Sequence, residues 1–134
     1  MEYNENFENH GIPLDVIWSD LPYTDNNEYF KFSRAKFPTN LLERMKLTID
    51  MSRRKLVVIT DPHISNSDTF SVHLSGNDVE EYEEENGIVY NIWVKRFDGD
   101  HFVGHCWSGS SKYVDYINEE ARKWWGSLYD YSFF

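Results

Sequence analysis

The sequence predicts an α/β fold built around parallel β-strands. Two short apolar runs, at residues 14–18 and 55–60, are rich in aliphatic and β-branched residues and lack a clean alternation of apolar and polar positions. That pattern is typical of strands buried on both faces of a parallel sheet. A helical pattern at residues 40–51 lies between the two runs. Strand, helix and strand in this order predict a βαβ unit, in which the helix crosses over between two parallel strands.

The connecting helix has its own start signal. Asn40 is expected to cap it, and Glu43 follows three residues later, the spacing of a capping box. Pro38 stands just upstream, as is common near a helix start. The apolar residues of the stretch then recur on one helix face; they are Leu41, Leu42, Met45 and Ile49.

The second half of the chain predicts a small antiparallel excursion. Residues 65–87 are polar and rich in turn formers, which predicts a loop. Residues 88–95 predict a strand, residues 97–100 a turn and residues 101–103 the returning strand. A last helix is expected to begin at Asn118, because two glutamates follow in the first turn, where negative charge suits the helix dipole.

The alternation of strands and helices favours part of a (β/α)8 barrel. Such a barrel needs ~200 residues or more, so about two of its βα units, with the antiparallel excursion, fit in 134 residues. We therefore expect residues 1–134 to form a partial barrel. The aromatic residues at 131–134 predict that the chain is cut just before a further strand. Because part-barrels have unpaired strand edges, we expect the isolated chain to be poorly soluble or oligomeric.

Composition and charge exclude several classes of partner. The formal net charge is −10, and the sequence pI is about 4.8. A strongly acidic surface repels phosphate backbones and anionic lipid, so neither nucleic acid nor a membrane is an expected partner. The chain contains no apolar run near the ~20 residues that span a bilayer. Cys106 is the single cysteine, which excludes an internal disulfide and any multi-cysteine metal site.

Two aspartates follow the predicted parallel strands. Asp20 comes after the first strand, and Asp61 follows the second. Ligands of parallel α/β folds bind at the carboxyl ends of strands, where two carboxylates can bind sugar hydroxyls or act as an acid and base pair. Aspartate is also a common turn former, so the pattern alone leaves both interpretations open.

Two further groups of residues are candidates for a metal site and for sugar binding. Asp61, His63 and His73 suggest a metal-dependent hydrolase, but the spacing contains no tight ligand pair, so a metal is disfavoured. Trp107 stands beside the small residues of the sequence SGSS. Its flat face suits stacking on a sugar ring, although burial in the core is the commoner fate of a tryptophan.

Four segments, in order, resemble the α-glucosidases of glycoside hydrolase family 31. They are residues 12–20 (IPLDVIWSD), 54–64 (RKLVVITDPHI), 104–110 (GHCWSGS) and 113–125 (YVDYINEEARKWW). Tyr29 and Phe30 also resemble the start of the family's YFTWD passage. The pattern is most similar to the catalytic subunits of the family that remove glucose from N-glycans.

The resemblance implies part of a TIM barrel and a retaining α-glucosidase. It implies that Asp20 binds hydroxyls of the terminal glucose in the −1 subsite and that Leu21 and Ile64 form apolar walls. It also implies that Trp107 lines the same subsite and that Asp61 supports it. Where the family has proline after this tryptophan, the chain has Ser108, so the loop is expected to be less rigid.

No catalytic residue is assigned to this chain. The family's nucleophile belongs to a WxDMNEP motif, which these 134 residues do not contain, and the acid/base aspartate lies further downstream. We therefore expect no activity from the chain alone. The resemblance implies no cofactor, a glucose-terminated oligosaccharide or N-glycan as substrate, a regulatory β subunit as a partner and the lumen of the endoplasmic reticulum as location. The alternative is a non-catalytic carbohydrate-binding or interaction module.

Overall fold

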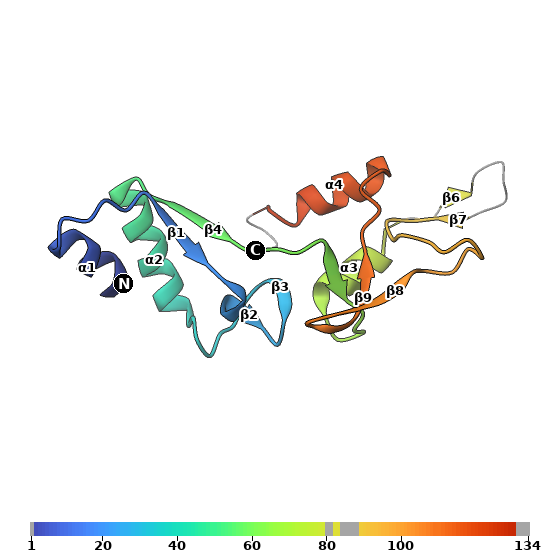
Figure 1. The fold of residues 1–134 in the computed structure, drawn as a ribbon, viewed down its shortest axis with the longest axis horizontal. Helices are drawn as coiled ribbons and strands as arrows, with labels where there is room; N and C mark the ends of the chain where they lie inside the picture. The colour runs from blue at the N-terminus through green and yellow to red at the C-terminus, as the bar shows by residue number, and fades with distance from the viewer. Residues whose placement is uncertain (1, 80–81, 84–88, 131–134) are drawn as a thin grey trace. The chain divides into compact units, whose positions relative to one another are not determined.

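The computed structural model of the chain describes residues 2–79, 82–83 and 89–130. The chain divides into two compact units, and each is described by itself. The first comprises Met1–Asp25 and Phe32–Ile59, and the second comprises Asn26–Lys31 and Thr60–Phe134. The first unit contains the parallel strands, and the second contains the antiparallel sheet (Figure 1). No helix in the described ranges is long and apolar enough to span a bilayer.

The first unit is the predicted βαβ unit. Its elements in chain order are α1 (Glu2–Asn9), β1 (Val16–Ser19), the 3-10 helix η1 (Leu21–Tyr23), β2 (Thr24–Asp25), α2 (Thr39–Ser52) and β4 (Lys55–Val58). β1 and β4 pair in parallel, from Val16 opposite Lys55 to Ser19 opposite Val58. α2 connects them, which confirms the crossover that the sequence predicts.

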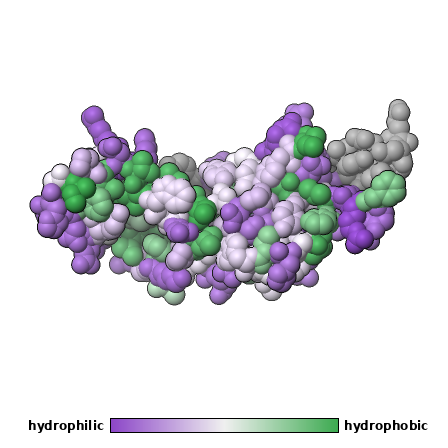
Figure 2. All heavy atoms as spheres, viewed as in Figure 1, coloured by the Kyte–Doolittle hydropathy of each residue, from purple (hydrophilic) through white to green (hydrophobic). Residues whose placement is uncertain are grey.

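One face of this two-stranded sheet is covered and the other is not. Ile17 lines a small apolar cavity with Met45 and Ile49 of α2 and with Tyr3 of α1. On the opposite face, Trp18 is 63% exposed. Apolar side chains accordingly reach the surface of this unit (Figure 2). The prediction that both strands are buried on both faces is therefore wrong for the described residues, because helices pack on one face only.

The start of α2 differs from the prediction. The helix begins at Thr39, so Asn40 lies inside it and not at the N-cap position. Pro38 takes the N-cap position in an extended conformation, without a side-chain cap. Its carbonyl oxygen accepts the backbone N–H groups of Leu41 and Leu42 at 2.8 and 3.1 Å. The proline carbonyl thus starts the hydrogen-bond ladder two residues before the expected cap.

The second unit is built on a three-stranded antiparallel sheet. Its elements are β3 (Glu28–Phe32, all but its last residue), β5 (His63–Ser65), α3 (Ser71–Asn77), β6 (Tyr82–Glu83), β7 (Val89–Tyr90), β8 (Val103–Cys106), β9 (Gly109–Tyr113) and α4 (Glu119–Ser127). The sheet has the order β5-β9-β8, and β6 pairs with β7. α4 begins as expected, since the Asn118 side chain accepts the N–H of Glu120 at 2.9 Å.

The antiparallel excursion is present, but its predicted bounds were wrong. The predicted strand at 88–95 is regular only at Val89–Tyr90; beyond it, Trp93 and Lys95 make isolated bridges to Val114 and His101. Residue 88 lies outside the described residues. The turn at 97–100 is confirmed by the Arg96 N–H, which donates to the carbonyl of Asp100 at 2.7 Å. The regular returning strand is β8, because its hairpin with β9 supplies the ladder of hydrogen bonds.

The predicted loop at 65–87 contains the helix α3. Its start signal is distant in sequence: Glu28 is 3% exposed, and its Oε1 accepts the hydroxyl of Ser71 at 2.5 Å and the N–H of Val72 at 3.3 Å. A carboxylate at a helix start satisfies free N–H groups. No local pattern contains this cap, which is why the sequence predicted a loop.

Candidate functional site

Trp107 lies at the tip of the hairpin that joins β8 and β9. Cys106 pairs with Gly109, so Trp107 and Ser108 form a two-residue connection. Gly109 has φ of 100°, a conformation that favours glycine and closes the turn. The Trp107 side chain remains 44% exposed. The hairpin therefore presents an indole face that is open to solvent.

The indole N–H of Trp107 is held by two oxygens. Nε1 donates to Oδ2 of Asp61 at 3.0 Å and to the hydroxyl oxygen of Tyr29 at 3.2 Å. The Tyr29 hydroxyl donates its own proton to the same Asp61 oxygen. The rings of Tyr29 and Trp107 meet edge to face, with centroids 5.9 Å apart. These three side chains, which we call the indole clamp, fix the edge of the exposed aromatic ring.

The electrostatics of the indole clamp assign each group a protonation state. The hydrogen bond from Tyr29 holds the pKa of Asp61 below its ordinary value, and the bond from Trp107 acts in the same direction. Burial raises the pKa of Tyr29, and the Asp61 carboxylate raises it further. Asp61 is thus a carboxylate that accepts hydrogen bonds at neutral pH. A carboxylate that is ionised at neutral pH suits support of Trp107 better than general acid catalysis.

His63 and Ile64, which follow shortly after Asp61 in the sequence, are buried. His63 is 5% exposed, and its ring is 5.7 Å from that of Tyr29 and 6.1 Å from that of Trp107, centroid to centroid. Its buried Nε2 has no hydrogen-bond partner among the residues that the structure describes. Ile64 is 2% exposed and lies opposite Lys112 in the sheet. Ile64 therefore belongs to the core of its unit, and its assignment as a pocket wall stays a prediction.

Asp20 and Leu21 belong to the first unit. Asp20 follows β1 and caps η1, because its Oδ1 accepts the N–H of Leu21 at 2.7 Å. Its side chain is exposed, and Leu21 is half-buried. The turn-forming role of Asp20 is thus present in the structure, and the exposed carboxylate is also accessible to a ligand.

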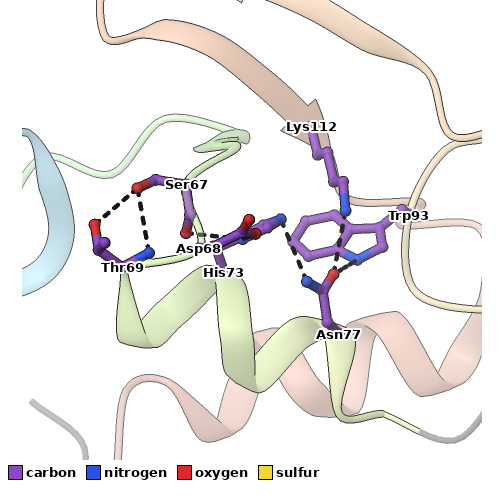
Figure 3. Close-up of polar contacts among 7 residues, drawn as sticks. All are labelled: Ser67, Asp68, Thr69, His73, Asn77, Trp93 and Lys112. Carbon is purple, nitrogen blue, oxygen red and sulfur yellow. Dashed lines mark hydrogen bonds and ion pairs between the residues drawn. The ribbon is translucent and has the colours of Figure 1, made fainter.

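The structure disfavours the metal alternative. Both ring nitrogens of His73 have partners: Nδ1 lies 2.9 Å from the carbonyl oxygen of Ser67, and Nε2 lies 3.5 Å from the amide nitrogen of Asn77 (Figure 3). Within residues 2–79, 82–83 and 89–130, no three His, Cys, Asp or Glu side chains gather to hold a metal ion. Asp61, His63 and His73 are therefore not brought together as ligands.

His73 instead begins a buried polar network. The amide oxygen of Asn77 accepts the indole N–H of Trp93 at 3.0 Å and the ammonium of Lys112 at 3.2 Å (Figure 3). His73 and Trp93 are each 1% exposed, and Lys112 is 9% exposed. Because the Asn77 oxygen faces two donors, its NH₂ group faces His73 and requires an unprotonated Nε2. The network therefore favours neutral His73.

Acid is expected to destabilise the second unit through its buried histidines. Burial lowers the pKa of both His63 and His73, and the nearby Lys112 charge lowers that of His73 further. Below the unfolded pKa of about 6.5, the unfolded chain binds protons that the folded chain does not. The free energy of unfolding is therefore highest above this pH and falls as the pH drops below it. Pulse proteolysis in urea at pH 7.5 and 5.5 measures this loss. His73→Gln should reduce the difference between the two pH values, whereas the exposed His10→Gln should leave it unchanged.

The fold and this site together define a class. Parallel strands joined by a helix, with an aspartate directly after the first strand, are typical of (β/α) barrels, whose ligands bind at the carboxyl ends of the strands. The profile of the glycosyl hydrolases family 31 TIM-barrel domain matches residues 1–134. The chain belongs to this family, and it corresponds to part of the barrel domain.

Similarities to known proteins, in sequence and in structure, agree with this family assignment. The chain is 36% identical over 130 residues to a probable glucan 1,3-alpha-glucosidase of Arabidopsis thaliana. The matched region covers 97% of this chain but 13% of the relative. It is similar in structure to a glucosidase II alpha subunit with alpha3-Glc2 bound, with a TM-score of 0.76 and 33% identity over 98% of this chain and 13% of that one. An ER glucosidase II complex of catalytic subunit and binding domain of the regulatory subunit gives a TM-score of 0.71 and 32% identity, with the same coverage.

Sequence reasoning found Asp61 and Trp107 but missed Tyr29. Tyr29 is separated from Asp61 by 32 positions and from Trp107 by 78. No spacing rule connects residues so far apart. The only available signal was the YF pair that resembles the family's passage, and it carries no information about the contact.

Proposed function

We propose that the chain supplies part of the sugar-binding wall of a retaining α-glucosidase that acts on terminal α-linked glucose. The observation that carries the proposal is the half-exposed indole of Trp107, held at its N–H edge by Asp61 and Tyr29. An aromatic face with a fixed orientation stacks on the C–H face of a sugar ring without losing much side-chain entropy on binding. Membership of family 31 supports the reaction class.

Each assigned residue has a separate role in the proposal. Trp107 stacks on the glucose ring, and Asp61 supports the indole. Asp20 accepts hydrogen bonds from glucose hydroxyls remote from the bond that breaks, while Leu21 and Ile64 contribute apolar walls. Remote binding of this kind can be used to stabilise the transition state.

The two reacting carboxylates are not among these residues. Retaining enzymes place a nucleophile and an acid/base about 5–5.5 Å apart. The family's nucleophile motif does not occur in the 134 residues, so the proposal places the bond-breaking chemistry in residues that this chain does not supply.

The substrate class and partner extend the proposal. The similar glucosidase II alpha subunit binds alpha3-Glc2, which supports a glucose-terminated oligosaccharide as substrate; we propose that it is of the N-glycan type. The similar catalytic subunit forms a complex with the binding domain of a regulatory subunit. A regulatory β subunit and the lumen of the endoplasmic reticulum are therefore the partner and location that we propose.

Hydrolysis of an aryl α-glucoside tests the division of roles. Residues 1–134 alone are expected to give no turnover above the uncatalysed rate, because no retaining pair is present. The full-length protein that carries this sequence is expected to release the aryl group and to retain the anomeric configuration of glucose. Clear turnover by the 134-residue chain, or a full-length protein without glucosidase activity, would contradict the proposal.

A further inference from the structure

The segment that contains Tyr29 is inserted into the second unit. Residues Asn26–Lys31 belong to this unit, although the chain on either side of them belongs to the other. Glu28, Tyr29 and Phe30 are consecutive, and each is at most 3% exposed. Three buried side chains in a row leave the segment little freedom to shift.

Each neighbour of Tyr29 has its own anchor. Glu28 caps α3 through Ser71 and Val72. Phe30 meets the ring of Trp125 on α4 edge to face, with centroids 5.3 Å apart. Phe30 also has a φ of 62°, a conformation that is costly for a bulky residue and persists only where the surroundings enforce it. The two anchors fix the backbone of Tyr29 from both sides and aim its side chain at Asp61.

The geometry points to Tyr29 as a positioning residue that orients Trp107 for sugar stacking, which is a role that depends on the proposed function. Its hydroxyl donates to Asp61 and accepts from Trp107, so it contacts both other members of the indole clamp. Its ring also meets the Trp107 ring edge to face, at an interplanar angle of 83°, and so packs against the indole as well as bonding to it. Tyr29 has no direct contact with substrate in this role and acts through Trp107.

A variant that removes the Tyr29 hydroxyl and keeps the ring tests this role. Tyr29→Phe keeps the ring and its packing but removes the proton donor to Asp61 and the second acceptor for the indole N–H. In the full-length protein we expect KM for an aryl α-glucoside to rise about fivefold to tenfold, as for the loss of one hydrogen bond of ordinary net strength. We expect kcat to change little, because stacking on the glucose ring contributes in the ground state as well as in the transition state.

Four further variants complete the test. Tyr129→Phe is the control: it removes a tyrosine hydroxyl that lies 2.8 Å from the hydroxyl of Thr60, outside the indole clamp. This variant should leave KM unchanged. Asp61→Asn should raise KM as Tyr29→Phe does, and the double variant should be less than additive because the residues act through one indole. Trp107→Ala should raise KM more than either.

The outcomes distinguish this inference from the proposed function. If Trp107→Ala leaves KM unchanged, the sugar-wall proposal fails, and the role of Tyr29 fails with it. If Trp107→Ala raises KM but Tyr29→Phe behaves as Tyr129→Phe does, the sugar wall stands and the positioning role is overturned. A loss of thermal stability in Tyr29→Phe with unchanged KM would likewise overturn it, since that result indicates a purely structural hydroxyl.

Discussion

Replacing Asp20 with alanine in the full-length protein is expected to lower kcat/KM for an aryl α-glucoside about a hundredfold to a thousandfold. Loss of a carboxylate that accepts hydrogen bonds from a ligand costs ~2–5 kcal/mol when the ligand groups are left unpaired. Asp20 is exposed and follows a parallel strand, which is where barrel enzymes bind their ligands. Steady-state kinetics of the purified variant measure the effect.

Two controls separate binding from local folding in this experiment. Asp20 also caps η1, and Asp20→Asn keeps a good capping side chain but removes the charge. The asparagine variant should therefore retain wild-type stability and still lose most of the activity. Asp15 directly precedes the start of β1, at the end of the strand opposite to Asp20. Asp15→Ala removes an equal charge and should leave kcat/KM unchanged. Equal losses in the Asp15 and Asp20 variants would contradict the binding role of Asp20.

Replacing Trp93 with alanine is expected to destabilise the second unit by ~3–5 kcal/mol. Trp93 is 1% exposed and packs on Trp124, with ring centroids 5.6 Å apart. A Cβ at Gly76 would lie 2.5 Å from the Trp93 ring, so α3 approaches the indole as closely as only glycine permits. Truncation would leave a cavity at this contact and would also unpair the amide oxygen of Asn77 from its indole donor.

Pulse proteolysis of the chain in urea measures this loss and needs little protein. Phe97→Ala is the matched control, because Phe97 is a fully exposed aromatic at a turn and surface truncations stay within ~0.5 kcal/mol. The urea midpoint should fall strongly for the Trp93 variant and should not move for the Phe97 variant. Similar midpoints for the two variants would show that Trp93 is not the centre of the core.

Local pattern was sufficient for the elements whose signals are contiguous. The parallel strands and α2 were predictable because each has its apolar residues and end signals within a few positions. α4 was predictable for the same reason, through its Asn118 cap. Asp20 directly follows β1, and Asp61 comes three residues after the end of β4. The same reasoning therefore found the two aspartates but could not choose between a turn and a ligand-binding role.

Contacts between distant residues account for what the sequence did not predict. α3 is capped by Glu28, which lies 43 positions before Ser71. The exposed face of the β1–β4 sheet depends on which elements cover it, and strand composition contains no such information. The indole clamp depends on a pairing between β3, the residues after β4 and the tip of the β8–β9 hairpin. Its geometry favours the supporting role of Asp61 over an acid and base pair.

Titration of glucose into the full-length protein by calorimetry, with wild type and Trp107→Ala compared side by side, tests the central claim most directly. The indole held by Asp61 and Tyr29 is proposed as the stacking face for the terminal glucose. We therefore expect saturable binding by the wild type and an affinity reduced at least about tenfold in the variant, as for loss of an aromatic contact. Equal affinities for glucose would contradict the claim that Trp107 lines the sugar site.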